Sequence, residues 1–200
     1  METTYNPKRF MIVVRIGKLF TMGLMVLMYL GAALALLGTG IALFIPASVL
    51  TFSLDSINTL RVETMNVRIA LPIDFIDGNV MVKWLAISAM LAGAVYLVFF
   101  GTIIRFMHGL FADVAKEKPF SEANVMRLFN MSYWMFAGAV ILPLCAMVVG
   151  GQFIRLVDVA ESSVVYSVHD NLLLTGVLVW VLASVFRYGK HLQDEVDQTV

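Results

Sequence analysis

The sequence has few charged residues and a single cysteine. Asp, Glu, Lys and Arg make up only 14% of the 200 residues, whereas 60% are hydrophobic. A soluble domain carries about 25% charged residues, so a water-exposed fold of this size is excluded. The fourteen basic and fourteen acidic residues cancel, which removes the usual electrostatic case for direct nucleic-acid binding. Cys145 alone forms neither an internal disulfide nor a multi-cysteine metal or redox site.

Ionisable residues are missing from the centres of the long apolar runs. The three histidines, His108, His169 and His191, fall at or beyond the ends of these runs. Pumps and membrane enzymes usually carry ionisable groups inside the bilayer, because such costly groups persist only where they function. The sequence also has no HExxH, CxxC or glycine-rich phosphate motif. We therefore predict that the protein is not an enzyme and has no catalytic residues, no metal ligands and no cofactor.

Four stretches without charge predict four membrane-spanning helices. About 20 apolar residues cross the hydrocarbon core as a helix. The fourth stretch, Asn171–Phe186, has only sixteen residues; we still assign it as a span, because Arg187 snorkels at one end while His169 and Asp170 lie among headgroups at the other. We predict a single membrane domain over residues 1–200, with spans at about 19–45, 84–106, 129–153 and 170–187.

Basic residues are unequally divided between the two sides of such a bundle. Four spans put both termini, the middle loop 107–128 and the tail 188–200 on one side. That side and its border hold ten Lys and Arg residues, against four in and around the loops 46–83 and 154–169. The positive-inside rule therefore places both termini in the cytoplasm and makes the loops 46–83 and 154–169 extracytoplasmic.

The two extracytoplasmic loops contain strand-like patterns. Leu60–Glu63 and Val67–Leu71 alternate apolar and polar residues, which is typical of half-buried strands, and Thr64–Asn66 is suited to a hairpin turn. Ser163–Val168 in the second loop is also strand-like. The predicted fold is thus an all-α membrane protein, a four-transmembrane-helix bundle with a small extracytoplasmic β cap that joins both loops. The cap either binds an external ligand or only closes the bundle.

Two prolines predict local features of the third span and of the loop before it. Pro119 ends the preceding helix, because the residue before a proline avoids helical geometry, and Ser121 is a suitable N-cap for the next helix. Inside the third span, Pro143 lacks the amide that would bond the Ala139 carbonyl, so we expect a kink there.

Two motifs carry a resemblance to a known family. The middle loop contains Lys118–Ser121 with Asn124 close behind, and the tail, Phe186–Val200, follows the form F-x-x-G-x-x-L-x-x-E-x-D-x-T-V. In these motifs and in its overall layout, the sequence resembles a bacterial family of small four-helix inner-membrane proteins of unassigned function. The resemblance implies a place in the bacterial inner membrane. Members are often encoded beside a helix-turn-helix regulator of the Cro/C1 type, which implies such a cytoplasmic partner.

Both motifs lie on the predicted cytoplasmic face. We therefore predict a non-enzymatic inner-membrane protein that senses a membrane condition or sequesters a cytoplasmic transcription regulator, with the lipid bilayer as its other partner. A small transporter or an immunity-type membrane protein is the alternative, and a transport path through four helices would require a homo-oligomer. The candidate partner-binding residues are Lys118, Pro119, Phe120, Ser121, Asn124, Leu192, Glu195 and Asp197.

Overall fold

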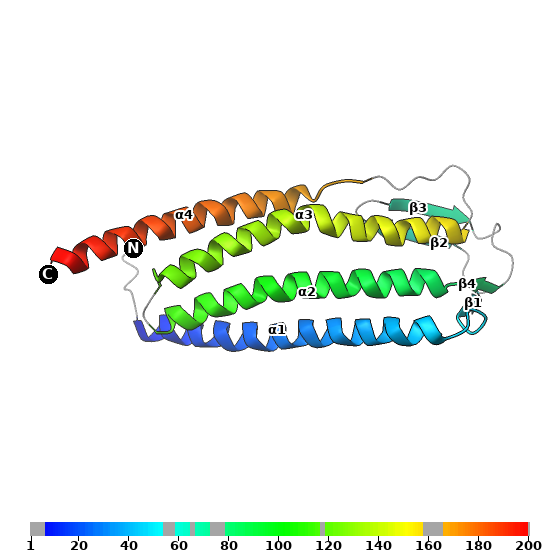
Figure 1. The fold of residues 1–200 in the computed structure, drawn as a ribbon, viewed down its shortest axis with the longest axis horizontal. Helices are drawn as coiled ribbons and strands as arrows, with labels where there is room; N and C mark the ends of the chain where they lie inside the picture. Colours follow the sequence, from blue (N-terminus) through cyan, green and yellow to red (C-terminus); the bar gives the residue numbers. More distant parts are fainter. Residues whose placement is uncertain are drawn as a thin grey trace. The chain divides into compact units, whose positions relative to one another are not determined.

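Four long helices dominate the computed structural model of the protein (Figure 1). The structure describes residues 7–53, 59–64, 67–72, 79–116, 119–157 and 166–199. Each helix is long enough and apolar enough to cross a membrane, which confirms the predicted multi-pass membrane protein with four helices. The helices are α1 (Pro7–Phe44), α2 (Lys83–Val114), α3 (Glu122–Val157) and α4 (Asp170–Thr199).

The helices are longer than the hydrocarbon core requires. The longest, α1, has 38 residues, or about 57 Å of helix against a core of about 30 Å. Its first residue, Pro7, suits a first helical turn, because the amide that proline lacks has no partner there. Helical structure therefore extends beyond any bilayer, and the positions of the bilayer boundaries along the helices stay a prediction.

The connection between α1 and α2 contains the strands that alternation predicted. Strands β2 (Thr59–Thr64) and β3 (Val67–Pro72) pair antiparallel, with Thr64 opposite Val67. Strands β1 (Thr51–Ser53) and β4 (Asn79–Met81) form a second antiparallel pair next to the helix ends. The predicted turn residues Met65 and Asn66 lie outside the described residues.

The strand predicted in the second loop has no counterpart among the described residues. Ser163–Val165 lie outside them, and Tyr166–His169 are not in a strand. A β cap that joins both loops therefore stays a prediction.

The chain divides into two compact units, each with its own packing. Unit 1 comprises Met1–Tyr29, Val98–Gly138 and Asp170–Val200, and unit 2 comprises Leu30–Leu97 and Ala139–His169. Unit 1 thus contains parts of α1, α2 and α3 and all of α4. Unit 2 contains the remaining parts of α1, α2 and α3 together with the strands.

Close approach of helices holds unit 1 together. A Cβ on Gly138 of α3 would overlap the Phe99 ring of α2, and a Cβ on Gly176 of α4 would lie 2.8 Å from the Phe136 ring of α3. Trp134 stacks on Phe99 and donates its indole N–H to the Phe99 carbonyl at 3.2 Å. Such close packing replaces the hydrophobic driving force that helices lose in lipid.

In unit 2, one lysine joins the end of α1 to the start of α2. Lys83 Nζ donates to the carbonyls of Leu43 at 3.0 Å and Ile45 at 2.8 Å. Carbonyls at a helix C-terminus have no partner within the helix and carry partial negative charge, so a cation stabilises them.

α3 continues through Pro143 because donors from outside the helix satisfy its carbonyls. The Ala139 carbonyl, which the sequence predicted to lose its helical donor, accepts the backbone N–H of His169 at 3.1 Å. The hydroxyls of Tyr166 and Tyr96 donate to the carbonyls of Val140 and Leu142 at 3.3 and 3.2 Å. Within unit 2, the contacts of Tyr166 and His169 thus place the segment 166–169 beside α3 at Ala139 and Val140.

Candidate partner-binding site

The loop between α2 and α3 ends at a capped helix start. The backbone N–H of Asn124 donates to Ser121 Oγ at 3.3 Å, and the N–H groups of Asn124 and Val125 donate to the Ser121 carbonyl. Glu122 follows in the first turn, where the helix dipole favours a negative charge. The predicted N-cap is confirmed, and Ser121 therefore has a structural role of its own.

Asn124 is fully buried and fixes the shape of this loop. Its side chain has no solvent exposure. Its Nδ2 donates to the Pro119 carbonyl at 3.0 Å, and its Oδ1 accepts from Arg127 at 2.6 Å. A partner on the surface does not reach this side chain, so Asn124 would support a binding site only by holding the loop.

Arg127 connects the start of α3 to the end of α2. Its guanidinium forms an ion pair with Asp113 and donates to the Gly109 carbonyl at 3.2 Å. The hydrogen bond from Arg127 is the main cause that lowers the pKa of the Asp113 carboxyl below its ordinary value. A Cβ on Gly109 would lie 2.5 Å from Arg127 Nε, so glycine leaves room for the arginine.

No motif in the sequence predicted this hydrogen-bonded network of Asn124, Arg127, Asp113 and Gly109. The sequence offered two signals for the network. Asp113 and Arg127 carry opposite charges on the two sides of a loop that contains a proline, and Gly109 lies one helical turn before Asp113.

The two family-like motifs meet in unit 1. Phe120 of the loop packs on Phe186 of α4 with ring centroids 5.2 Å apart. One turn later, Gly189 brings the α4 backbone close to the same ring, because a Cβ there would lie 3.1 Å from Phe120. The loop motif and the tail motif thus share one contact, which sequence spacing did not predict.

Aromatic contacts fasten α4 to α3 before the tail begins. The Arg187 guanidinium lies 4.3 Å from the centroid of the Phe129 ring, in cation–π geometry. Trp180 approaches the same ring edge-to-face, with centroids 6.3 Å apart. Together with the Phe120–Phe186 contact, these pairs fix which face of α4 packs against α3.

The tail of the chain continues α4 as far as Thr199. Lys190 pairs with Asp194 at 2.6 Å, and His191 approaches Glu195 at 3.3 Å, both one turn apart on the exposed helix. Tyr188 and Leu192, also one turn apart, keep 63% and 43% of their surface exposed.

The eight candidate residues are therefore distributed over two segments of unit 1. Pro119, Phe120 and Ser121 lie in the loop, Asn124 lies in the first turn of α3, and Leu192 and Glu195 lie on the α4 tail. Lys118 lies outside the described residues. Asp197 is helical, but its side chain is not described.

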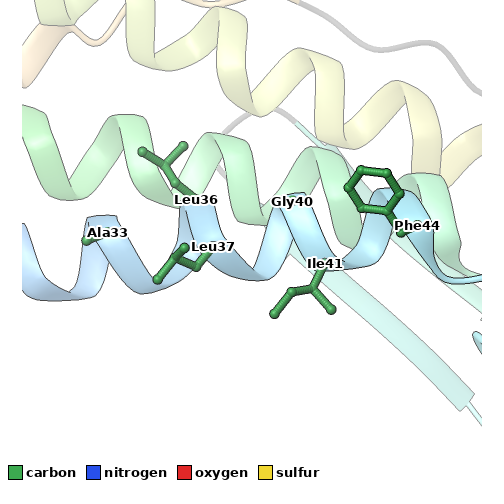
Figure 2. Close-up of a pocket in the computed structure, with 6 residues that line it drawn as sticks. All are labelled: Ala33, Leu36, Leu37, Gly40, Ile41 and Phe44. Carbon is green, nitrogen blue, oxygen red and sulfur yellow. The ribbon is translucent and has the colours of Figure 1, made fainter.

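The described residues offer little chemistry elsewhere. No group of three or more His, Cys, Asp or Glu among them is arranged to hold a metal ion. A shallow hollow follows one side of α1 (Figure 2), and it is lined only by apolar residues and glycine: Ala33, Leu36, Leu37, Gly40, Ile41 and Phe44. Such a surface suits contact with lipid chains and offers no polar group to a substrate.

Comparison with known proteins identifies the family. A family model described as "Protein of unknown function (DUF2975)" matches residues 76–200, which is more than half of the chain and includes α2, α3, α4 and both motifs. The chain belongs to this family. Searches of curated proteins and of solved structures found no match.

Proposed function

We propose that this member of the family is a non-enzymatic protein of the bacterial cytoplasmic membrane that binds a cytoplasmic helix-turn-helix transcription regulator. The observation that carries the proposal is the contact between its two motifs. Phe120 of the loop packs on Phe186 and Gly189 of α4, so the loop and the tail act as one surface. We call this surface, made by residues 119–121 and 188–196, the loop–tail surface.

The exposed residues of the loop–tail surface support binding to a protein. Tyr188 and Leu192 are exposed on one side of α4, beyond Arg187 and the apolar stretch. Phe120 is also partly exposed next to the helix. In water, neighbouring exposed apolar side chains are unusual unless a partner covers them. The pairs Lys190–Asp194 and His191–Glu195 lie in the same turns of α4 and give these apolar side chains a polar border.

The orientation of this surface rests on the distribution of basic residues. Ten Lys and Arg residues accompany the termini and the middle loop, against four around the other loops. We accordingly propose that the loop–tail surface faces the cytoplasm and that the strands between α1 and α2 contribute to an extracytoplasmic cap. A sensor needs two arrangements whose balance a signal shifts, and the cap and the Pro143 region are the parts proposed to move.

Recruitment of the regulator tests the proposal. The proposed partner, a helix-turn-helix regulator encoded beside the gene, is fused to a fluorescent protein and expressed with the full membrane protein or with a chain truncated after Phe186. We expect a membrane-localised signal with the full chain and a cytoplasmic signal with the truncated chain. The double variant Tyr188→Ser/Leu192→Ser should resemble the truncation, whereas the matched control Gln193→Ala, also exposed on this helix, should resemble the full chain. Unchanged localisation and unchanged target-gene expression after truncation would refute the proposal.

A small transporter is the second candidate, and a different observation favours it. Three donors, from Tyr96, Tyr166 and His169, gather around the Pro143 region of α3. α3 is continuous there, but polar groups that meet helix carbonyls near a proline are also found where transporters bind their substrates. This function would require an oligomer, and flux of a small solute into proteoliposomes, reduced by Tyr96→Phe, would support it.

A further inference from the structure

Two basic residues of unit 1 carry charges that no carboxylate among the described residues balances. They are Lys18 of α1 and Arg105 of α2, and both are exposed. The carboxylate of Asp113, two turns after Arg105, forms ion pairs with Arg127 and Lys116. Lys18 directly precedes the first predicted span, and Arg105 lies at the end of the second. Both unbalanced charges therefore belong to the same predicted edge of the membrane.

A contact between α1 and α2 brings these two residues close together. The Nδ1–H of His108 donates to the Lys18 carbonyl at 3.1 Å, because a carbonyl oxygen only accepts. The same Nδ1 lies 3.2 Å from the hydroxyl of the buried Thr21. Arg105 precedes His108 by three residues, so the two are neighbours on the surface of α2. The cations of two helices are thus adjacent within unit 1.

The helical projection puts both cations on the same side of this helix pair. Lys18 precedes Thr21 by three residues, just as Arg105 precedes His108, so each cation is turned by about 60° from the residue that contacts the other helix. α1 and α2 run antiparallel (Figure 1). In antiparallel neighbours, the same rotation leads to the same side, so the two charges face one another across the α1–α2 contact.

Exposed apolar side chains continue the face of each cation toward the middle of its predicted span. Met22 and Val26 follow Lys18 by one and two turns and are 51% and 54% exposed. Val98 precedes Arg105 by two turns and is 39% exposed. A phospholipid matches both parts of this surface, because its phosphate is anionic and its acyl chains are apolar. A water-soluble anion would leave the apolar part uncovered.

We propose that Lys18 and Arg105 bind the phosphate of an anionic phospholipid. The acyl chains lie along the apolar side chains that continue the two faces. An arginine guanidinium donates two parallel hydrogen bonds to a phosphate, and a lysine adds a compact positive charge. His108 acts as a positioning residue, because it holds the α1 backbone beside α2. The proposal requires only that the protein spans a membrane, and it does not depend on the binding of a regulator.

The binding of lipids to the purified protein in detergent tests the site. Native mass spectrometry measures the dissociation constants of dioleoylphosphatidylglycerol, which is anionic, and of dioleoylphosphatidylcholine, which has the same chains and no net charge. The unchanged protein is compared with Lys18→Gln/Arg105→Gln. The matched control is Lys116→Gln/Lys190→Gln, which removes the same charge from other positions in unit 1.

The unchanged protein should bind the anionic lipid about 30-fold more tightly than the neutral one, because each basic residue near a headgroup contributes about a factor of five. The double variant Lys18→Gln/Arg105→Gln should lose this preference, and the control should keep it. Equal affinity of the unchanged protein for the two lipids, or an equal loss in the control, would overturn the proposal. An excess of inorganic phosphate should not displace the lipid, and displacement would show that the site binds a free anion instead.

Single variants keep the test decisive if the double variant does not elute as folded protein. Arg105→Gln should weaken the binding of the anionic lipid about fivefold. Arg105→Lys keeps the charge and should retain most of the preference. If Arg105→Gln binds dioleoylphosphatidylglycerol as tightly as the unchanged protein does, Arg105 does not contact the phosphate and the proposal is wrong.

Discussion

Replacing Asn124 with alanine should destabilise the protein strongly, although the change is small. Asn124 is fully buried, and its side chain donates a hydrogen bond to the Pro119 carbonyl and accepts one from Arg127. A neutral hydrogen bond contributes about 1 kcal/mol and one to a charged group about 1.5–3 kcal/mol. Arg127 keeps its ion pair with Asp113, so we expect the lower part of this range. Asn124→Ala should lower the free energy of unfolding by about 2–3 kcal/mol.

The matched control is Asn130→Ala on the same helix, because Asn130 is exposed. An exposed helix position should change stability by about 0.5 kcal/mol or less, and alanine is the better helix former. Both variants are unfolded with SDS in mixed micelles, and tryptophan fluorescence reports the free energy of unfolding. If Asn124→Ala lowers the free energy of unfolding by no more than Asn130→Ala does, the hydrogen bonds assigned to Asn124 do not stabilise the protein.

Three further perturbations test the packing of Gly138 on Phe99, the hydrogen bonds from Lys83 to the end of α1, and the ion pair between Asp113 and Arg127. Gly138→Ala should lower the free energy of unfolding by about 1–3 kcal/mol, because the new Cβ overlaps the Phe99 ring. The control Gly93→Ala should raise it by up to about 1 kcal/mol, because a Cβ there meets no atom within 4 Å. The same SDS titration measures both variants. Lys83→Met should lower the thermal midpoint in detergent, since it removes two hydrogen bonds at the end of α1. The pKa of Asp113 is lowered in the folded protein, so its carboxylate stabilises the fold at pH values above the ordinary pKa of 3.8, and this stability is lost as the pH falls through the folded pKa. When the free energy of unfolding is measured down to pH 3, Asp113→Asn should therefore lose less stability in acid than the unchanged protein. An equal loss of stability would contradict this.

Local signals predicted the elements of the fold well. The uncharged runs identified the four helices, the alternation in Leu60–Glu63 and Val67–Leu71 identified β2 and β3, and a serine after a proline identified the start of α3. These features depend on residues that are close in the sequence. The helices extend beyond the predicted membrane spans, because absence of charge marks the apolar part of a helix and not its end.

Contacts between distant segments were not predicted. The freed carbonyl of Ala139 followed from Pro143, but its donor, His169, lies 30 residues away and donates through its backbone, which side-chain identity does not reveal. Likewise, the motifs around Phe120 and Phe186 were recognised as separate segments. Their contact depends on how α4 packs on α3, and Gly189 shows its importance only when the neighbouring ring is known.

The side of the membrane that carries the loop–tail surface is the central claim of the functional proposal. Two separate fusions measure it directly, one with a fluorescent protein after Val200 and one with alkaline phosphatase after Val200. The first is fluorescent only in the cytoplasm, and the second is active only outside it. The account predicts fluorescent cells without phosphatase activity. Active phosphatase without fluorescence would place the tail outside the cytoplasm and contradict the binding of a cytoplasmic regulator.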